Sequence, residues 1–241
     1  MLDIFGPTDL LLITVSFITS FITAAIGIGG GTLLLAVMAQ LLPAGAIIPI
    51  HGVVQAGSNL GRSLLLFAHV HWRLVVVFVL GALIGAFVGG QIVISLPPNI
   101  LKLILGVFIL FSVWGPTLKQ SRLSVFGLGI GGLLTTLLTM FVGATGPFVL
   151  SLIRTFGLSP GDTVATNSVC VMVQHVFKIA VFGLLGFNFA PYATLVVAMI
   201  AFGFAGTYLG KIILLKSPPK RFDQLLKLVL SVLAVRLIIP L

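Results

Sequence analysis

Two basic side chains lie inside apolar segments of this 241-residue chain, 116 positions apart. Arg62 ends the stretch HGVVQAGSNLGR, and Lys178 ends the stretch NSVCVMVQHVFK. A cation is expensive to place in an apolar, membrane-embedded segment, so it indicates a functional site. Ammonium and guanidinium groups form charge-assisted hydrogen bonds with small anions. The two positions therefore predict a binding site for an anion.

The same spacing relates further polar residues and glycines. The pairs are Asn59 with His175, His51 with Asn167, Gly27 with Gly143, and Gly30 with Gly146. This recurrence predicts two repeats, residues 1–118 and 119–241. Many transporters are built from such repeats and bind their substrate where the two repeats meet. Coincidental matching of apolar helices is the alternative, but aligned polar residues argue against it.

The composition identifies an integral membrane protein. The chain is 59% hydrophobic and only 7% charged, whereas soluble domains carry about 25% charged residues. Its long continuous apolar stretches favour helices over the alternating pattern of a membrane barrel. The net charge of +9 comes from cations mainly at the ends of apolar segments. These cations set topology and predict no nucleic-acid partner.

Eight apolar segments define an all-α membrane fold surrounded by lipid. They fall at about 10–42, 46–68, 73–95, 99–116, 124–156, 162–186, 190–215 and 222–240. The first and fifth are each 33 residues long, against roughly 20 residues needed to span a bilayer. Small residues interrupt them at 27–32 and 143–147. We expect each to be a broken or re-entrant helix followed by three transmembrane helices; a single long tilted helix is the alternative.

The placement of cations favours the re-entrant arrangement. If both long segments cross the membrane, six cations face three on the other side. If both return to their own side, only Lys102 lies opposite eight cations: Arg73, Lys119, Arg122, Arg154, Lys211, Lys216, Lys220 and Arg221. Positive residues prefer the cytoplasm. The sequence thus predicts inverted repeats in the inner (cytoplasmic) membrane, crossing it several times, with both termini outside.

The candidate site combines charge, amides and backbone donors. Polar side chains recur at helical spacing along 46–68 and 162–186, so each set shares one helix face. A helix that begins at a glycine break presents free N–H groups to an anion. The candidate residues are Arg62, Lys178, Asn59, His175, His51, Asn167, Gln174, Gly29, Gly30, Gly31, Thr32, Thr145 and Gly146. Snorkelling cations, and histidines that only bond between helices, are the structural alternatives.

Other patterns point away from catalysis. No Asp or Glu lies deep in a segment, and Asp162 is expected to cap a helix. His69 and His71 lie at a segment end, where an interfacial role is favoured over a metal site. Ser58 lacks the turn that a serine hydrolase needs. We therefore expect no enzyme activity, metal or cofactor. Gly81, Gly85 and Gly89 are spaced for helix packing.

Several of these stretches together resemble the sulfite exporter TauE/SafE family of membrane permeases. They are ITSFITAAIGIGGGTLLLAVM, GSNLGRSLLLFAHVHW, GALIGAFVGG and, more weakly, GATGPFVLSLI. The resemblance covers essentially the whole chain. It implies export of sulfite or transport of a small organosulfonate, and this agrees with a cationic site.

The sequence therefore predicts a transporter, most simply an exporter, of a small sulfur oxyanion or sulfonate. An anion channel, or a membrane subunit that only binds a partner, are the alternative functions. The choice of anion, the direction of transport and the coupling ion stay open. So does the oligomeric state, and a homo-oligomer is compatible with the sequence.

Overall fold

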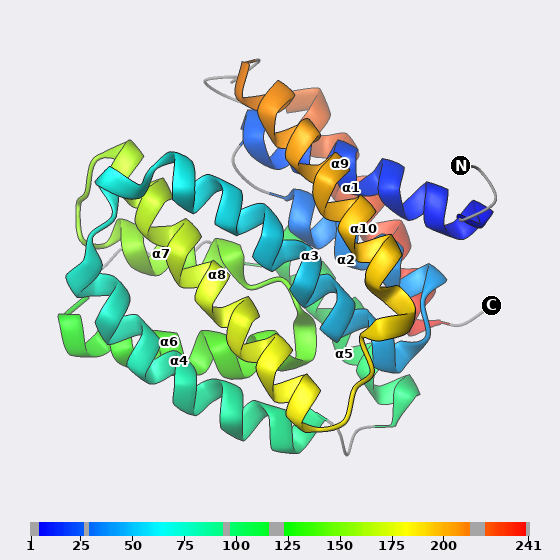
Figure 1. The fold of residues 1–241 in the computed structure, drawn as a ribbon, viewed down its shortest axis with the longest axis horizontal. Coiled ribbons are helices and arrows are strands. Elements are labelled where there is room, and N and C mark those ends of the chain that lie inside the picture. The colour runs from blue at the N-terminus through cyan, green and yellow to red at the C-terminus, as the bar shows by residue number, and fades with distance from the viewer. Residues whose placement is uncertain (1–4, 27–28, 94–96, 116–122, 213–219, 240–241) are drawn as a thin grey trace. The chain divides into compact units, whose positions relative to one another are not determined.

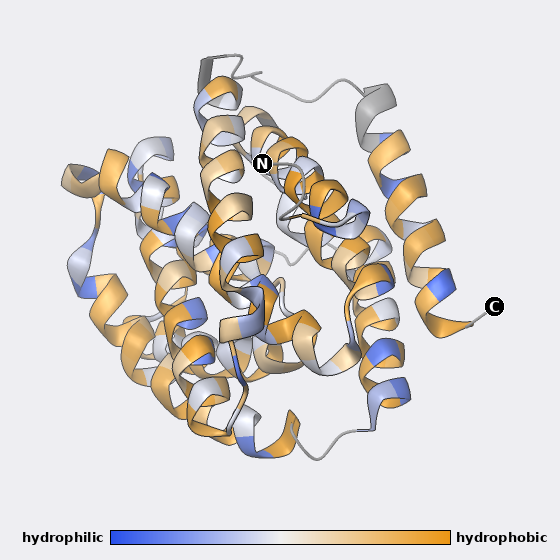
Figure 2. Ribbon diagram, turned by 45° about the vertical axis from the view of Figure 1, so that its right-hand side comes forward, coloured by the Kyte–Doolittle hydropathy of each residue, from blue (hydrophilic) through white to orange (hydrophobic). Residues whose placement is uncertain are grey.

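The computed structural model describes residues 5–26, 29–93, 97–115, 123–212 and 220–239 (Figure 1). The side chains of residues 26, 211–212 and 220–223 are not described. All regular elements in these ranges are helices. Hydrophobic residues, orange in Figure 2, run along most of the helices. An all-α fold is thus confirmed.

The helices follow one order twice. The first series is α1 (Pro7–Ile26), α2 (Gly30–Leu41), α3 (Ala44–Leu65), the 3₁₀ turn η1 (Phe67–His69), α4 (Trp72–Val93) and α5 (Pro98–Trp114). The second is α6 (Val125–Val142), α7 (Gly146–Arg154), α8 (Pro160–Leu184), the 3₁₀ turn η2 (Ala190–Tyr192), α9 (Ala193–Ile212) and α10 (Lys220–Ile238). Each of the eight apolar segments therefore contains a helix or a pair of helices.

Both long segments are interrupted at their glycines, as predicted. Gly29 ends the first break with a backbone φ of 95°, and Gly143 opens the second with a φ of 75°. Side chains disfavour this left-handed region, so glycine is needed at both positions. Helix α2, after the first break, packs against α1, before it. The contact is close, since a Cβ on Gly30 would collide with the Thr19 carbonyl. Gly27 lies outside the described residues.

Five described helices are long and apolar enough to cross a membrane. The qualifying ranges are Pro7–Ala25, Trp72–Val93, Val125–Val142, Pro160–Leu184 and Ala190–Gly210. Helix α3 is also long, with 22 residues, but it carries His51, Asn59 and Arg62. The membrane class follows from these helices. The prediction of inverted orientation depends in part on Lys119, Arg122 and Lys216, which lie outside the described residues.

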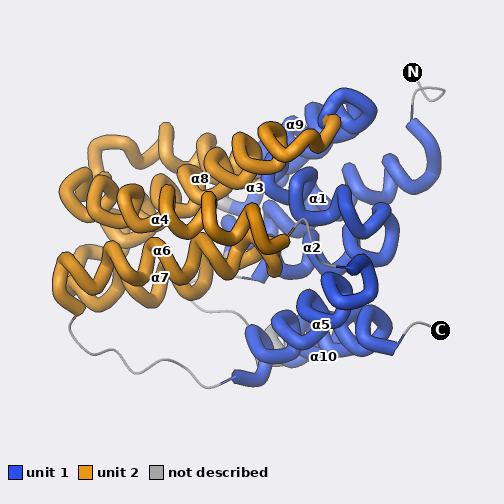
Figure 3. Tube along the Cα trace, turned by 90° about the horizontal axis from the view of Figure 1, so that it is seen from below, with its two compact units in different colours: residues 1–54, 97–115, 189–241 blue, residues 55–96, 116–188 orange. Residues whose placement is uncertain are grey.

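The chain forms two compact units (Figure 3). Unit 1 contains Met1–Val54, Pro97–Gly115 and Phe189–Leu241, and unit 2 contains Gln55–Leu96 and Pro116–Asn188. Each unit takes helices from both halves of the sequence. In unit 1, α1 packs along α9, and in unit 2, α4 packs along α6. The fourth α-helix of each half thus packs against the first α-helix of the other half.

Glycines make these two helix pairs equivalent. A Cβ on Gly85 of α4 would meet the Leu133 carbonyl of α6, and a Cβ on Gly206 of α9 would meet the Phe17 carbonyl of α1. Phe17 and Leu133 are again 116 positions apart. The predicted packing role of the α4 glycines is confirmed, because their backbones touch another helix directly. Close backbone approach through small residues is a common way to pack membrane helices.

We expect Gly81→Ala to destabilise unit 2, since the added methyl group would overlap the Gly129 carbonyl of α6. Overpacking of this kind costs about 1–3 kcal/mol. Thermal unfolding of the purified protein in detergent measures the loss. The matched control is Gly45→Ala, because nothing lies within 4 Å of a Cβ at Gly45. An unchanged melting temperature for Gly81→Ala would contradict the close α4–α6 contact.

Candidate functional site

A row of threonine hydroxyls lines one buried face of α6. Thr136 and Thr139 have no exposed surface, and Thr135 is 9% exposed. Spacings of three and four residues put Thr135, Thr136 and Thr139 on the same side of the helix. Thr135 Oγ1 donates to the Gly131 carbonyl at 2.7 Å, so its hydroxyl can accept from another group. The face is a polar strip inside an otherwise apolar helix.

Gln174 of α8 lies against this strip. Its Nε2 donates to Thr135 Oγ1 at 3.0 Å and to Thr136 Oγ1 at 2.9 Å. Its Oε1 accepts from Thr145 Oγ1, just before α7, at 3.4 Å. Gln174 is fully buried and Thr145 is 1% exposed. One amide thereby joins α6, α8 and the break between α6 and α7.

Lys178 lies one turn further along α8 and is also completely buried. Its Nζ donates to Thr139 Oγ1 at 3.1 Å and to the Gly143 carbonyl at 3.2 Å. Gly143 follows the last residue of α6, so the ammonium lies at the negative end of that helix dipole. Thr139 Oγ1 itself donates to the Gly143 carbonyl at 3.2 Å. The cation, the hydroxyl and the helix end form one small cluster.

Among the described residues, the Lys178 ammonium is bonded only to neutral groups. The chain contains four acidic residues: Asp3, Asp9, Asp162 and Asp223. Asp162 pairs with His69 and His71 and not with Lys178. An ammonium has three N–H donors, and Lys178 uses two of them on Thr139 and Gly143. A buried cation with a spare donor and no anionic partner is chemically suited to bind an anion.

Arg62 and Asn59 form a second polar group in unit 2, on α3. The Arg62 Nη2 group donates to Asn59 Oδ1 at 3.1 Å, and Asn59 Nδ2 donates to the Gln55 carbonyl at 2.8 Å. The buried Arg62 Nε has no hydrogen-bond partner among the described residues. Asn59 therefore orients the guanidinium while leaving donors free. Arg62 and Asn59 are three residues apart, as are Lys178 and His175.

His51 lies in unit 1, beside the first break. Its Nε2 is 3.0 Å from the Gly31 carbonyl. A carbonyl only accepts, so Nε2 carries the proton in this contact. Gly29 precedes the first turn of α2, and Thr32 within that turn is 5% exposed. The structure thus joins His51 to Gly31. In unit 2 it separately joins Gln174 to Thr145, with Lys178 one turn further along α8.

The remaining candidates lie on α8 and at the start of α7. His175 is 3% exposed, and Asn167 has a buried Oδ1 without a hydrogen-bond partner in the described part of the chain. Gly146 begins α7, and nothing lies within 4 Å of a Cβ built there. Convergence of all the predicted residues on one site stays a prediction.

Sequence reasoning included Thr145 but missed the α6 threonines that bind Gln174 and Lys178, which are Thr135, Thr136 and Thr139. A signal was present, because the 116-residue spacing also relates Thr19 to Thr135, Ser20 to Thr136 and Thr23 to Thr139. Threonines inside apolar helices commonly bond to their own helix backbone. Because such bonds are local, the sequence does not reveal that these hydroxyls also accept hydrogen bonds from a neighbouring helix.

The predicted cap at Asp162 is wrong. Ser159 caps α8 instead, and its Oγ accepts from the Asp162 backbone N–H at 3.2 Å. The Asp162 carboxylate instead pairs with His69 Nδ1 at 3.0 Å and with His71 Nε2 at 3.5 Å. This cluster is largely exposed, in keeping with the interfacial position expected for the histidines. The described residues contain no group of three or more side chains suited to hold a metal ion.

The apolar helices and the buried polar clusters define a multi-pass helical membrane protein. Residues 12–237 match the sulfite exporter TauE/SafE family model, so the chain belongs to that family. It is therefore a membrane transporter of the class that carries sulfur compounds, and the resemblance found in the sequence is confirmed. No curated protein and no solved structure matches the chain.

Thr139 is expected to be essential for the stability of the Lys178 cluster. In Thr139→Val the ammonium loses an acceptor while the side-chain volume is nearly kept, and an unsatisfied buried group costs about 1–3 kcal/mol. Thr139→Ser keeps the hydroxyl and is the matched control. Melting temperatures in detergent compare the two. Equal stability of both variants would mean that Lys178 does not depend on this hydroxyl.

Proposed function

We propose that the protein exports a small sulfur oxyanion, sulfite or a small organosulfonate, and binds it at Lys178. The observation that carries this proposal is the fully buried ammonium of Lys178 held only by neutral partners among the described residues. Burying a charge without a counter-charge costs several kcal/mol. A bound anion would offset that cost and would use the third N–H donor.

The surrounding groups suit a tetrahedral or pyramidal oxyanion. Such an anion carries several acceptor oxygens close together, and Lys178 lies one turn from the Gln174–threonine network. In the proposed site, Arg62 adds a second positive charge oriented by Asn59. His175, His51 and Asn167 orient the anion. Backbone donors come from Gly29, Gly30, Gly31 and Gly146, with Thr32 and Thr145 as hydroxyl donors. The proposed function is transport, without catalysis or cofactor.

We further propose that residues 1–118 and 119–241 are inverted repeats with both termini outside the inner membrane. The repeated element order and the equivalent glycine contacts of α4 and α9 support the duplication. The inverted orientation is supported by the cation count, because each repeat then contains one re-entrant pair and three crossings.

Lys178→Gln and Arg62→Gln are each expected to weaken sulfite binding about 10- to 100-fold, since each removes a charge-assisted hydrogen bond worth about 1.5–3 kcal/mol. Arg62→Lys should recover part of the affinity, because lysine keeps the positive charge but lacks the planar guanidinium that forms two parallel hydrogen bonds. Sulfite-dependent thermal stabilisation gives the affinity, and sulfite flux from proteoliposomes gives the rate. Arg154→Gln is the control, an exposed cation on α7.

The outcomes separate the candidate functions. Wild-type affinity in both glutamine variants would refute the cationic site. Flux that barely saturates and follows membrane potential alone would identify a channel. No flux of any anion by the folded wild-type protein would leave only a partner-binding subunit.

The topology is tested with reporter fusions. A fusion after residue 241 is expected outside, and one in the loop at 117–122 is expected in the cytoplasm, because three crossings and one re-entrant pair separate the two points. Fusions at residues 43 and 154 test the re-entrant pairs themselves. A cytoplasmic C-terminus together with an external 117–122 loop would reverse the orientation. If residues 43 and 154 report the same side, the re-entrant arrangement is wrong.

A further inference from the structure

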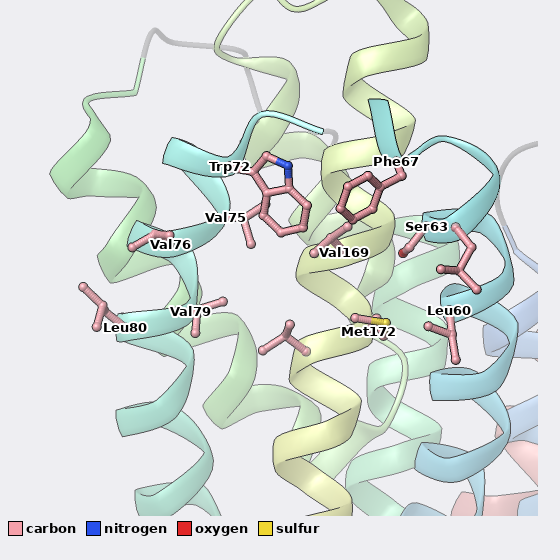
Figure 4. A pocket seen from close by; sticks show the side chains of 12 residues that line it. Leu60, Ser63, Phe67, Trp72, Val75, Val76, Val79, Leu80, Val169 and Met172 are labelled. Carbon is pink, nitrogen blue, oxygen red and sulfur yellow. The ribbon is translucent and has the colours of Figure 1, made fainter. Parts of the chain in front are cut away.

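A groove of about 410 Å³ lies in unit 2, outside the polar clusters (Figure 4). Helices α3, α4 and α8 line it with side chains such as Leu60, Leu64, Val76, Leu80, Met172 and Val173. Ser63 contributes the one hydroxyl among the lining residues, and its Oγ donates to the Asn59 carbonyl at 2.8 Å. The groove therefore presents an apolar surface, and its volume is in the range of about 300–1,000 Å³ for ligand sites.

Exposed apolar side chains line the groove. Leu64 is 66% exposed, Leu80 is 63% exposed and Val76 is 56% exposed. Val76 and Leu80 are on α4, one of the helices suited to cross a membrane. In a bilayer, exposed apolar side chains at this depth contact acyl chains rather than water.

The depth of the groove distinguishes an acyl chain from a partner helix. Its lining on α4 runs from Trp72 to Leu80, and eight residues of helix rise about 12 Å. The hydrocarbon core is about 30 Å thick, so the groove remains within one leaflet. A transmembrane helix of a partner would pack along the full span. A single lipid chain enters from one interface and ends inside the leaflet.

The mouth of the groove has the residues of a membrane interface. Trp72 begins α4, and its ring lies 5.2 Å from the Phe67 ring between centroids. Tryptophan favours the headgroup level of a bilayer. Arg73 follows Trp72 directly and is exposed. A guanidinium at this level is matched to the phosphate of a lipid, which it can bind through two parallel hydrogen bonds.

We propose that this groove is a binding site for one acyl chain of a membrane phospholipid, with the lipid phosphate held by Arg73. The acyl chain lies along Val76 and Leu80 of α4 and Met172 of α8. Trp72 and Phe67 flank the end of the acyl chain that is nearest the start of α4. The site is separate from the anion site at Lys178, and its occupation does not depend on which anion is carried.

Photolabelling of the purified full-length protein tests the site. The probe is phosphatidylglycerol with a diazirine in the middle of one acyl chain, reconstituted at low mole fraction in unlabelled bilayers. Labelled peptides are mapped by mass spectrometry. We expect labels to concentrate on residues 60–80 and 169–173. Val76→Trp fills the groove and should lower this labelling at least fivefold. Val197→Trp is the matched control, a 67% exposed valine on α9 outside the groove.

A second probe tests the role of Arg73. Diacylglycerol with the same diazirine chain lacks the phosphate, so it should label the groove several-fold less than phosphatidylglycerol. Arg73→Gln should remove that difference, whereas Arg154→Gln should preserve it. Melting temperatures verify that each variant is folded, and Leu64→Trp replaces Val76→Trp if the latter is not.

The opposite results overturn the proposal. Labels spread evenly over the exposed residues of α4 and α9, unchanged in Val76→Trp, would show only bulk lipid around the protein. Equal labelling by the two probes would exclude phosphate recognition by Arg73. Labelling replaced by crosslinks between two copies of the chain at Val76 would assign the groove to a dimer contact.

Discussion

The rest of unit 2 is organised around the burial of the Lys178 charge. An ammonium inside an apolar helix bundle needs oriented dipoles, and the end of α6 supplies them through the Gly143 carbonyl and the Thr139 hydroxyl. That carbonyl is available only because α6 stops at Val142, and the chain turns there through the positive φ of Gly143. The glycine break thus has two ends of opposite polarity. Its α6 end holds the cation, and its α7 end is the positive end of a helix dipole, which favours an anion.

The two halves repeat this arrangement with different chemistry. In the sequence, the spacing of 116 residues makes Arg62 the counterpart of Lys178, Ser58 the counterpart of Gln174 and Gly29 the counterpart of Thr145. The amide and hydroxyl that join α6, α7 and α8 therefore have smaller counterparts in the first half. Thr23 Oγ1 donates to the Thr19 carbonyl at 2.9 Å, within its own helix, whereas Thr139 bonds to Lys178. In the proposed duplication, the backbone breaks and the cations are kept while the supporting side chains differ, so the two halves need not contribute equally to a bound anion.

The sequence predicted the elements better than their partners. The lengths of the apolar segments and the glycines that interrupt them located each described α-helix, including the division of both long segments, because these signals are local. The partners of Lys178 were not predictable in this way. Its position indicated a ligand, but the carbonyl and hydroxyl that hold it become visible only when α6 and α8 are packed. The same holds for the exchange of α4 and α9 between halves. Their glycines predicted close packing, yet nothing local in Gly85 or Gly206 says which helix will approach.

The glycine contacts also limit where the protein can move. Backbone atoms of α4 and α6 touch at Gly81 and Gly85, and those of α1 and α9 touch at Gly206. Helices packed at this distance have no side chains between them to rearrange, so each pair is expected to move as one body. Transport requires that some other element change conformation. The second break has room for such a change, because nothing lies within 4 Å of a Cβ built at Gly146. The Lys178 cluster lies at this break, so exchange of its carbonyl partner for an anion would act directly on the connection between α6 and α7.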